Sequence, residues 1–510
     1  MDHSDLGKLD QNLKFLVGSS FFVFLGIVLS KLLTYFYRII IARNFGPEIY
    51  GLFSLALIIF LWSISLSSFG IYEGIVRFVS FYRGKKDWSK INYLFRLAIF
   101  ILFCFSIIFG LALYYFSDIL ANSLFHNLSL ILFLKPLSFV IPLYVLSYAF
   151  LAVIQAFEKA KAYSFISDVL RSFFQVGSLF ILILIFGTKS GLIIISYIIG
   201  ILIIFFSSYF YCKNKIQVVF NKGNINKKIK AKIRGDLFSY SWPLIFSSTL
   251  LILFTSIDSV FVGYFRDAFD VGIYNAAIPI AMLLTFFPFL FIRLFYPMIN
   301  REFSRKNFGM IKELSKQVEK WIFMIGLPLS MIMILFPGEI ITLLFGADYI
   351  LAESVLKILA IGTFFYSMSL IPYNLLLMNG KSKIILLNII IVSVLNIILN
   401  ILLIPKYGLE GAAFSTTFSF VVLTLMYFIQ IKSYASFVPL RRKMINSVIS
   451  MSIPALIIIY IRQFLPTDSF SIFIQCSFLV LSYLFLTIIT RVFDKNDKSI
   501  LISIKKKMNL

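Results

Sequence analysis

Long apolar runs separated by short polar connections dominate the hydrophobic pattern of this chain. A membrane-crossing helix needs about 20 consecutive, mostly apolar residues, and the pattern contains fourteen runs of about that length. The pattern therefore predicts an all-α polytopic membrane protein with about fourteen transmembrane helices. The runs lie near residues 15–43, 48–70, 91–116, 128–157, 162–186, 191–212, 237–264, 271–297, 321–337, 354–378, 384–404, 411–431, 444–461 and 469–490.

The composition supports a lipid-embedded protein. The chain of 510 residues is 60% hydrophobic and 14% charged, whereas soluble domains are about 45–50% apolar and about 25% charged. Its net charge of +24 would suit nucleic-acid binding only if the basic residues formed a continuous face. They are spread over many loops instead, so we expect membrane lipids as partners and no nucleic acid.

Lysine and arginine are distributed unequally over the connections between the runs. Short cytoplasmic connections of membrane proteins collect these residues. With the N-terminus inside, the tails and inward connections hold 35 of the 47 basic residues, and the outward connections hold five. We therefore expect a multi-pass protein of the plasma membrane with both termini in the cytoplasm. The polar, acidic start of the chain also indicates that the first run is a span and not a cleaved signal.

The sequence lacks the residue patterns of a disulfide framework, a metal site and an ATP-binding phosphate loop. Cys104, Cys212 and Cys476 are widely separated in or beside apolar runs, so they offer neither a disulfide framework nor a CxxC metal site. His3 and His126 cannot form an HExxH zinc site, and the chain has no G-x-x-x-x-G-K-[ST] phosphate loop. We expect no metal, no cofactor, no enzymatic activity and no ATP hydrolysis within this chain.

A basic segment in the middle of the chain separates two similar halves. The first run leads into IARNFGPEIYGLFSLALI and the seventh into VGYFRDAFDVGIYNAAIPIA, and in each a tyrosine, Tyr50 or Tyr274, opens the next helix after a short turn. Six spans separate the copies, so the halves would share one orientation and be related by a pseudo-two-fold axis along the membrane normal. Chance similarity between Ile/Leu/Phe-rich helices is the alternative.

The repeat predicts how the chain is divided. We expect an N-terminal six-helix lobe at 1–212, a cytoplasmic linker at 213–236, a C-terminal six-helix lobe at 237–431, and two further helices with a basic tail at 432–510. The linker has eight basic residues between Lys213 and Arg234 and no acid there.

Seven basic residues lie within the apolar runs rather than in the connections. A charge at a helix centre costs at least about 2.5–3.5 kcal/mol, so such residues usually face water or a partner. The seven are Lys31, Arg38, Arg96, Lys135, Arg171, Arg293 and Lys357.

Polar residues form helical stripes on three of the predicted spans, as expected of faces that look inward. On the fifth span they recur at intervals of four, three, four and three. The stripes consist of Ser20, Lys31, Thr34 and Arg38 on the first span, of Ser164, Asp168, Arg171, Gln175 and Ser178 on the fifth, and of Ser248, Thr255, Asp258 and Ser259 on the seventh.

Several of these charges also have a purely structural interpretation. Asp168 and Arg171 are three residues apart and can neutralise each other. Lys357 has Glu353 one turn before it, which favours a local ion pair. Near the cytoplasmic ends of their helices, Arg96 and Arg293 can extend to the interface.

The remaining charges are our candidate site residues. Lys31, Arg38 and Lys135 have no acid nearby in the sequence, and Lys135 precedes Pro136 in a helix that we expect to be kinked. These three residues and Arg171 are the candidates for binding a substrate. Asp168 and Asp258 are the candidates for binding a coupling ion, Na⁺ or H⁺, or for acting as counter-ions.

The stretch GSSFFVFLGIVLSKLLTYFYRIIIARNFGPEIYGLFSLALIIF, followed by GIYEGIVRFVSFYRGKKD, resembles the start of polysaccharide and lipid-linked-oligosaccharide flippases. The stretch SYSWPLIFSSTLLILFTSIDSVFVGYF with VGIYNAAIPIA is similar to the matching second-half signature. These flippases belong to the multidrug/oligosaccharidyl-lipid/polysaccharide superfamily, which also contains drug/cation antiporters. The resemblance extends over the fourteen-span plan.

The resemblance and the excess of cations in the membrane agree on an anionic cargo. Cations that line a hydrated path offset the desolvation of a phosphate or diphosphate in the membrane core. We therefore expect a monomeric flippase that carries a lipid-linked anionic glycan outward by alternating access through a cationic central cavity. The alternatives are an ion-coupled multidrug or organic-cation antiporter of the same superfamily and, from another class, a membrane-embedded glycan polymerase or ligase.

Overall fold

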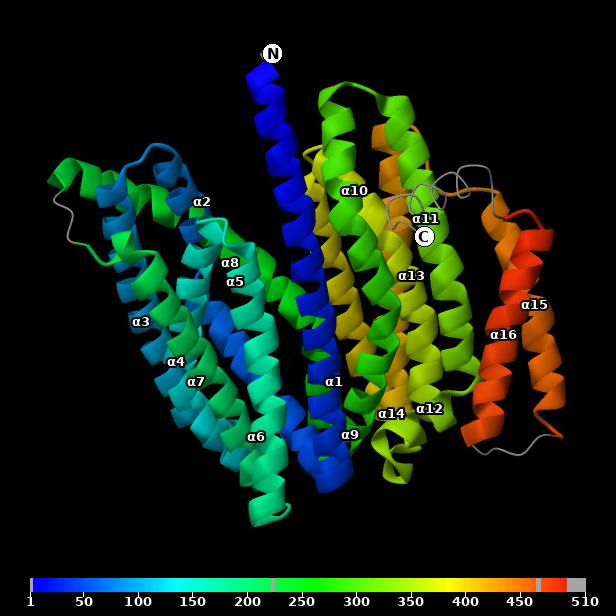
Figure 1. Ribbon diagram of the computed structural model, residues 1–510. Coiled ribbons are helices and arrows are strands. Elements are labelled where there is room, and N and C mark those ends of the chain that lie inside the picture. Colours follow the sequence, from blue (N-terminus) through cyan, green and yellow to red (C-terminus); the bar gives the residue numbers. More distant parts are fainter. Residues whose placement is uncertain (1–2, 222–224, 465–468, 493–510) are drawn as a thin grey trace. The chain divides into compact units, whose positions relative to one another are not determined.

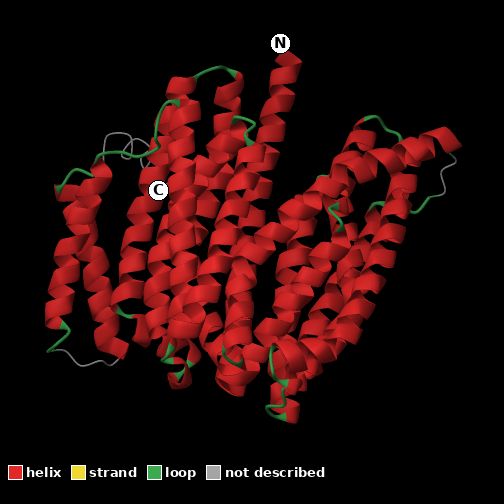
Figure 2. Ribbon diagram, turned by 180° about the vertical axis from the view of Figure 1, so that it is seen from behind, coloured by secondary structure: helices red, strands yellow, loops and turns green. Residues whose placement is uncertain are grey.

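In the computed structural model, the regular elements of the described residues are all helical, as Figure 2 shows. Eleven of the described helices are long and apolar enough to cross a membrane. The predicted all-α multi-pass membrane fold is therefore confirmed. The structure describes residues 3–221, 225–464 and 469–492, and within them the side chains except those of residues 3–24, 246–248, 251, 293–294, 297 and 469.

Two of these eleven helices contain two predicted spans each. Leu25–Ser68 includes most of the first and second predicted spans, and Ser382–Ala435 includes the eleventh and twelfth. The shorter apolar helix Ile252–Phe265 lies in the seventh predicted span. The described helices are thus consistent with fourteen spans.

The chain packs as two compact units, Met1–Gly272 and Ile273–Leu510. The boundary between these units falls inside the helix α9 (Ala268–Met282). The two six-helix lobes and the pseudo-two-fold axis expected from the sequence remain predictions.

In the N-terminal unit, α4 is a central helix that packs against α1, α2, α3 and α7, and most of its side chains are buried (Figure 1). The π-helix η1 continues α3, and the π-helix η3 leads into α6. The elements are α1 (His3–Ser68), α2 (Ile71–Gly84), α3 (Trp88–Ile119), η1 (Leu120–Leu124), η2 (Leu128–Leu130), α4 (Ile131–Ala156), α5 (Ala160–Ser164), η3 (Phe165–Leu170), α6 (Arg171–Phe186), α7 (Gly191–Lys215), η4 (Gln217–Val219) and α8 (Lys227–Phe265).

The helix α1 bends sharply at Gly46, whose φ of 79° lies in the left-handed region that favours glycine. Beyond the bend, α1 touches the beginning of α9 backbone to backbone. A Cβ on Gly51 would lie 1.8 Å from the carbonyl oxygen of Ala268, and a Cβ on Gly272 would lie 2.0 Å from that of Pro47. Neither position has room for a side chain, so the turn and the close approach both depend on glycine.

In the C-terminal unit, α13 packs along α14. The helix α14 is interrupted by a kink at Gly408, which has a φ of 58°, and the eleventh and twelfth predicted spans lie on either side of this kink. The elements are α9, η5 (Leu283–Thr285), α10 (Phe286–Ser304), α11 (Phe308–Leu335), α12 (Pro337–Phe345), η6 (Ala347–Tyr349), α13 (Ala352–Met378), α14 (Ser382–Ala435), α15 (Lys443–Ile461) and α16 (Ser469–Ile489).

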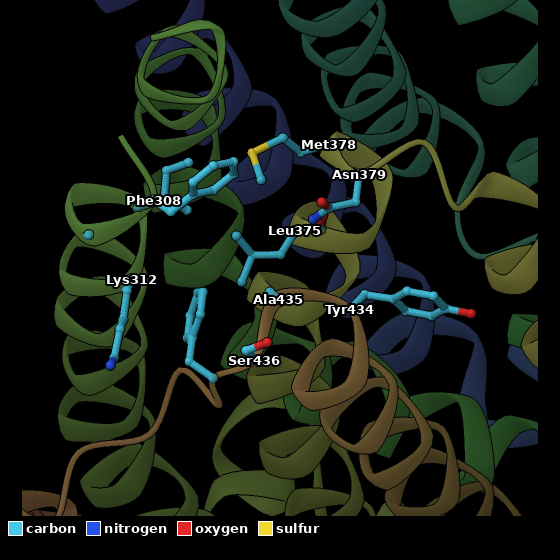
Figure 3. Close-up of a pocket in the computed structure, with 11 residues that line it drawn as sticks. Phe308, Lys312, Leu375, Met378, Asn379, Tyr434, Ala435 and Ser436 are labelled. Atoms are coloured by element: carbon cyan, nitrogen blue, oxygen red, sulfur yellow. The ribbon is translucent and has the colours of Figure 1, made fainter. Parts of the chain in front are cut away.

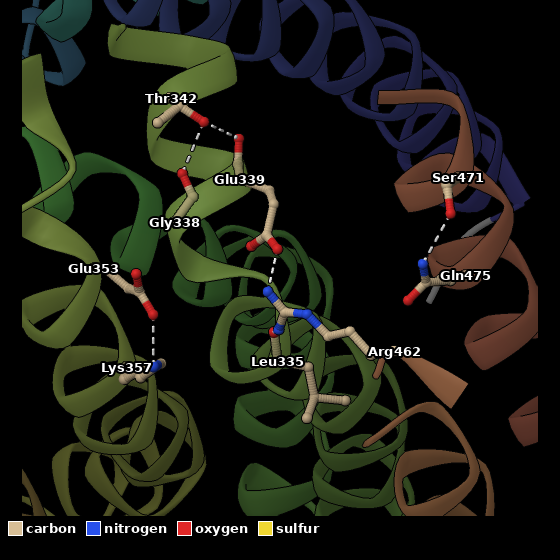
Figure 4. Close-up of polar contacts among 9 residues, drawn as sticks. All are labelled: Leu335, Gly338, Glu339, Thr342, Glu353, Lys357, Arg462, Ser471 and Gln475. Carbon is tan, nitrogen blue, oxygen red and sulfur yellow. Dashed lines mark hydrogen bonds and ion pairs between the residues drawn. The ribbon is translucent and has the colours of Figure 1, made fainter. Parts of the chain in front are cut away.

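The last two helices are attached to α11 and α12. The hydroxyl of Tyr483 in α16 donates a hydrogen bond to the carbonyl oxygen of Met324 in α11 at 3.1 Å. Arg462, just after α15, binds the carboxylate of Glu339 in α12 and the carbonyl oxygen of Leu335 (Figure 4). Apolar packing joins the same helices through Phe323, Leu327, Phe336, Met368, Met444, Met451, Ile458, Leu479 and Tyr483. The final pair is therefore part of the packed core of its unit.

Candidate functional site

Two predicted site residues, Lys31 and Arg38, lie with Thr34 of the same stripe along one face of α1 before the bend. Lys31 is exposed and Arg38 is half-buried. Between them, the Thr34 hydroxyl donates to the carbonyl oxygen of Ser30 at 2.8 Å. Within the described part of the chain, neither Lys31 nor Arg38 has an acidic partner. The stripe therefore carries two uncompensated positive charges; the side chain of Ser20 lies outside the described ones.

Arg38 contacts the tyrosine of the repeated turn. Its Nη1 donates to the hydroxyl of Tyr50 at 3.5 Å, and Tyr50 is fully buried. Residues twelve positions apart in a straight helix would be separated by about 18 Å. The contact between these two side chains therefore depends on the bend at Gly46.

Arg171 is held by aromatic side chains. Its Nη1 donates to the hydroxyl of Tyr144 at 3.3 Å, and its Nη2 donates to that of Tyr197 at 3.2 Å. The guanidinium also lies 5.4 and 5.7 Å from the centroids of these two rings, within cation–π range. The ring of Tyr148 stacks on Tyr144 with centroids 4.8 Å apart. We call Tyr144, Tyr148 and Tyr197 the tyrosine cage.

The predicted neutralisation of Arg171 by Asp168 is not what the structure contains. Asp168 instead accepts a hydrogen bond from the hydroxyl of Ser164 at 2.9 Å. Residues Phe165–Leu170 form the π-helix η3, which has more residues per turn than an α-helix. Because the extra residue rotates the chain, the three-residue spacing no longer places Asp168 beside Arg171.

An aromatic network connects the cage with α1. The hydroxyls of Tyr37 and Ser196 are hydrogen-bonded at 2.9 Å. The ring of Phe53 meets those of Tyr37 and Tyr197 edge-on, with centroids 6.1 and 6.0 Å apart. The core between α1, α4, α6 and α7 is thus an aromatic layer with Arg171 inside it.

Lys135 has an acidic partner that its sequence neighbourhood did not reveal. Its Nζ lies 3.0 Å from a carboxylate oxygen of Asp118 and 5.4 Å from the centroid of the Tyr114 ring. Both partners belong to α3, whereas Lys135 belongs to α4. The pairing depends on how these two helices pack, which a local sequence pattern does not contain.

One of the structural interpretations is confirmed, and that of Arg96 as a residue at the membrane interface stays a prediction. The ion pair between Lys357 and Glu353 is confirmed, with Nζ 2.7 Å from Oε1 (Figure 4). Arg96 is exposed and donates to the carbonyl oxygen of Phe220 at 3.2 Å. The side chain of Arg293 lies outside the described ones.

On α8, Asp258 and Ser259 of the predicted stripe are buried, 4% and 1% exposed. Asp258 also interacts with its surroundings, and the hydroxyl of Thr255 donates to the carbonyl oxygen of Ile252 at 3.1 Å. The side chain of Ser248 is not among those described. Asp258 thus keeps the burial that a coupling-ion or counter-ion role requires.

The sequence reasoning missed a set of buried amides on α14. Asn388 and Gln430 exchange two hydrogen bonds at 2.7 and 2.8 Å. The amide of Asn400 donates to Asn396 at 3.1 Å, and both side chains are fully buried. Asn388, Asn396 and Asn400 are spaced by eight and four residues, which is typical of a polar helix face. The sequence-based prediction considered charged residues only and therefore missed them.

No group of three or more His, Cys, Asp or Glu side chains suited to a metal occurs among the described residues. A cavity of about 330 Å³ in the C-terminal unit lies where the start of α11 meets the ends of α13 and α14 (Figure 3). Its lining includes Phe308, Lys312, Met378 and Tyr434, and none of the predicted site residues lines it.

Two family models match the chain. The model described as "Polysaccharide biosynthesis protein" matches residues 16–303, and the model MatE matches residues 243–402. The first of these covers more than half of the chain.

Among curated relatives, an uncharacterized membrane protein of Methanocaldococcus jannaschii is 32% identical over 38% of this chain and 38% of its own length. A putative O-antigen transporter of Shigella flexneri is 25% identical over 74% of this chain and 88% of its own length. A probable low-salt glycan biosynthesis flippase of Haloferax volcanii is 26% identical over 41% and 44%, respectively. The chain thus spans less than half of the first and third of these relatives and most of the second.

Solved structures share the fold. The lipid II flippase MurJ has a TM-score of 0.71 at 18% identity, over 92% of this chain and 98% of its own. A MATE multidrug transporter of the MOP superfamily in its inward-facing conformation has a TM-score of 0.68 at 16% identity, over 81% and 98%. At these identities, the likeness establishes the fold and not the cargo.

Proposed function

Because the chain belongs to the polysaccharide biosynthesis protein family, we propose that it is a flippase that moves a lipid-linked oligosaccharide from the cytoplasmic to the outer leaflet. The relatives and the solved structure that resemble the chain are named as transporters and flippases rather than enzymes. The proposed cargo joins its glycan to a polyprenyl lipid through phosphate or diphosphate. The protein would act in the plasma membrane with both termini in the cytoplasm, as a monomer.

The observation that carries this proposal is the pair of cations on α1. Lys31 is exposed and Arg38 half-buried, and neither has an acidic partner within the described residues. A positive charge held at membrane depth without a counter-ion is costly, and an anionic cargo would remove that cost while it is bound. A structural ion pair would instead supply its own acid, as Asp118 does for Lys135.

The two cations suit different parts of a phosphate-containing head. The planar guanidinium of Arg38 can bind two phosphate oxygens at once, whereas the ammonium of Lys31 acts as a point charge. The buried hydroxyl of Tyr50 accepts one N–H of Arg38 and so limits the orientations of the guanidinium. We assign Lys31 and Arg38 to cargo binding. Lys135 and Arg171 are the weaker candidates, because Lys135 is paired with Asp118 and the guanidinium of Arg171 is bound by two tyrosines of the cage.

The proposed mechanism is alternating access, in which the cationic stripe of α1 is exposed first to the cytoplasm and then to the outside while the lipid tail stays in the bilayer. Asp168 and Asp258 are the proposed sites for a coupling ion, Na⁺ or H⁺. Asp258 suits this role through its burial on α8. Asp168 suits it through its position within the π-helix η3, a feature often found at functional sites.

A second candidate is an ion-coupled organic-cation antiporter, which the MatE match over residues 243–402 favours. Such a transporter would need negative charge facing its cargo. The uncompensated side chains on the α1 stripe are cations instead, which is why we prefer an anionic cargo.

Reconstitution tests the proposal directly. Purified protein in vesicles should move a fluorescent polyprenyl-diphosphate oligosaccharide between leaflets, and Arg38→Ala should slow this movement about tenfold or more, in line with the loss of a charged hydrogen bond of about 1.5–3 kcal/mol. The matched control is Lys189→Ala, which removes an exposed cation from the connection between α6 and α7 and should leave the rate unchanged. Efflux of a cationic dye without movement of the glycan lipid would support the antiporter instead.

A further inference from the structure

The cavity in the C-terminal unit is lined by apolar and polar side chains together (Figure 3). Its volume of about 330 Å³ is at the lower end of the range for small-molecule sites, about 300–1,000 Å³. The cavity reaches the protein surface, because Phe308 is 60% exposed and Tyr434 is 42% exposed. Its apolar lining includes Phe308, Leu375 and Met378, and its polar lining includes Lys312, Tyr434 and Ser436.

Two cations without acidic partners lie at this cavity. Lys312, in the second turn of α11, is exposed and pairs with no acid among the described residues, and its neighbour Glu313 binds Arg441 instead at 3.0 Å. The Nζ of Lys381 lies 4.4 Å from the centroid of the Tyr434 ring, and Lys381 has no acidic partner in the described part of the chain either. The local charge at the cavity is therefore positive.

Hydrogen-bond donors for an anion come from separate elements. Lys312 supplies the N–H groups of its ammonium from α11. Ser436, exposed directly after α14, supplies a hydroxyl. The first turn of α11 also lines the cavity through Gly309, and the N-terminal end of a helix carries a positive partial charge. These donors stand beside the apolar side chains of the same cavity, so a matching ligand combines negative charge with an apolar part.

Phospholipids with a net negative charge have this combination. The cavity lies where the connections 301–320, 381–383 and 432–443 meet, and the orientation predicted from the basic residues places all three in the cytoplasm. Anionic lipids of the cytoplasmic leaflet attract basic segments beside the membrane, and their head groups bind basic pockets between helices on that side. A free phosphate would use the cations but would leave the apolar lining uncovered.

We propose that this cavity binds the head-group region of one anionic phospholipid of the cytoplasmic leaflet. The phosphate lies near Lys312 and Ser436, and the first carbons of an acyl chain contact Phe308, Leu375 and Met378. A cavity of about 330 Å³ holds this part of the lipid, and the rest of the chains continues into the bilayer. The lipid joins the ends of α11, α13 and α14. The choice of leaflet rests on the predicted orientation, but the site does not depend on the proposed flippase function.

Thermal unfolding of the full chain in detergent tests this site. Micelles that contain phosphatidylcholine are compared with micelles in which phosphatidylglycerol replaces part of it, at constant total lipid and ionic strength. Phosphatidylglycerol should raise the midpoint of unfolding by about 2 °C or more as it saturates the site. Inorganic phosphate added to the phosphatidylcholine micelles should not raise it, because phosphate alone does not cover the apolar lining.

Two variants separate this site from a general attraction of basic loops for anionic lipid. Lys312→Gln should increase the phosphatidylglycerol fraction needed for half of the shift about fivefold, the usual contribution of one lysine near an anionic lipid surface. Met378→Trp keeps every charge and fills part of the cavity. Its midpoint should no longer respond to phosphatidylglycerol, while its midpoint in phosphatidylcholine stays near that of the wild type.

The matched control is Lys228→Gln, which removes an exposed lysine of α8 on the same predicted side of the membrane and should keep the wild-type response. Equal midpoints of the wild type in the two lipid mixtures would overturn the proposal. An unchanged response in Lys312→Gln, which removes only a surface charge, would also overturn it, as would a loss of equal size in Lys228→Gln. A shift of the same size with inorganic phosphate would overturn the assignment to a lipid.

Discussion

Arg462 and Glu339 form an ion pair that ties the connection after α15 to α12, between residues 123 positions apart in the chain. The side chain of Glu339 is 16% exposed and that of Arg462 is 36% exposed. Removing one partner from a mostly buried pair leaves an uncompensated charge behind. The pair therefore contributes to holding the last two helices against the rest of their unit.

Arg462→Gln should destabilise the protein by about 1–3 kcal/mol, less than for a fully buried pair because the arginine is partly hydrated. The double variant Glu339→Gln/Arg462→Gln should recover part of this loss, since it leaves no unpaired carboxylate. Thermal unfolding in detergent measures both. Lys357→Gln is the comparison, because its pair with Glu353 is 45% and 40% exposed and should be worth about 0.5 kcal/mol or less.

The contact between α1 and the start of α9 should not tolerate a methyl group. Gly51→Ala and Gly272→Ala would each place Cβ within 2.0 Å of a carbonyl oxygen, so the helices would have to separate. We expect a large loss of folded protein, measured as the monodisperse fraction after extraction from the membrane.

The control for this prediction is Gly177→Ala in α6, where a Cβ would meet nothing within 4 Å. Since alanine favours a helix over glycine by about 1 kcal/mol, this variant should be unchanged or more stable. Wild-type behaviour of Gly272→Ala would mean that the two helices are not in close contact.

Lys31 and Lys135 should respond differently to neutralisation. Lys31→Met removes an exposed cation without an acidic partner and should slow glycan-lipid movement in vesicles while leaving thermal stability unchanged. Lys135→Met breaks the pair with Asp118 and should act on stability instead, by about 0.5 kcal/mol because Asp118 is 58% exposed. An equal effect of both variants on transport would contradict our separation of cargo-binding from structural cations.

The tyrosine cage should contribute through its hydroxyls as well as its rings. Tyr144→Phe and Tyr197→Phe each remove one hydrogen bond to the Arg171 guanidinium and keep the ring beneath it. Each variant should lose about 1–2 kcal/mol of stability, and the double variant should lose more than either. Tyr209→Phe, whose ring lies outside the cage, provides the baseline for a single lost hydroxyl.

The orientation predicted from the basic residues can be tested by labelling in intact cells. In a variant that lacks Cys104, Cys212 and Cys476, a cysteine at Lys189 should react with a membrane-impermeant maleimide. A cysteine at Lys228 should react only after the membrane is opened. The reverse pattern would show that the cytoplasmic assignment of the basic connections is wrong.

Much of the fold follows from local patterns in the sequence. The lengths of the apolar runs predict the spans, because the thickness of the bilayer sets the number of residues needed to cross it. The Lys357–Glu353 pair was predictable for a similar reason, since residues four apart on a helix are neighbours. Both conclusions use distances fixed by a single helix.

Other features of the candidate site could not be read in this way. A spacing of three pointed to a pair between Asp168 and Arg171, but the π-helix η3 turns Asp168 toward Ser164. No pattern in the residues Phe165–Leu170 signals that irregularity. The polar residues of the fifth span recur at helical intervals, but the π-helical turn places their side chains differently from an ideal α-helix.

What the sequence determined by itself was the all-helical, multi-pass membrane character of the fold and the excess of positive charge among its helices, because these depend on composition and on single-helix geometry. Tertiary structure alone decided which charges are compensated. Lys135 finds Asp118 and Arg462 finds Glu339 across separate helices, whereas Lys31 and Arg38 find no acid in the described structure. The physical reason is that ionic contacts act over a few ångströms, and only the packing of helices brings distant residues that close.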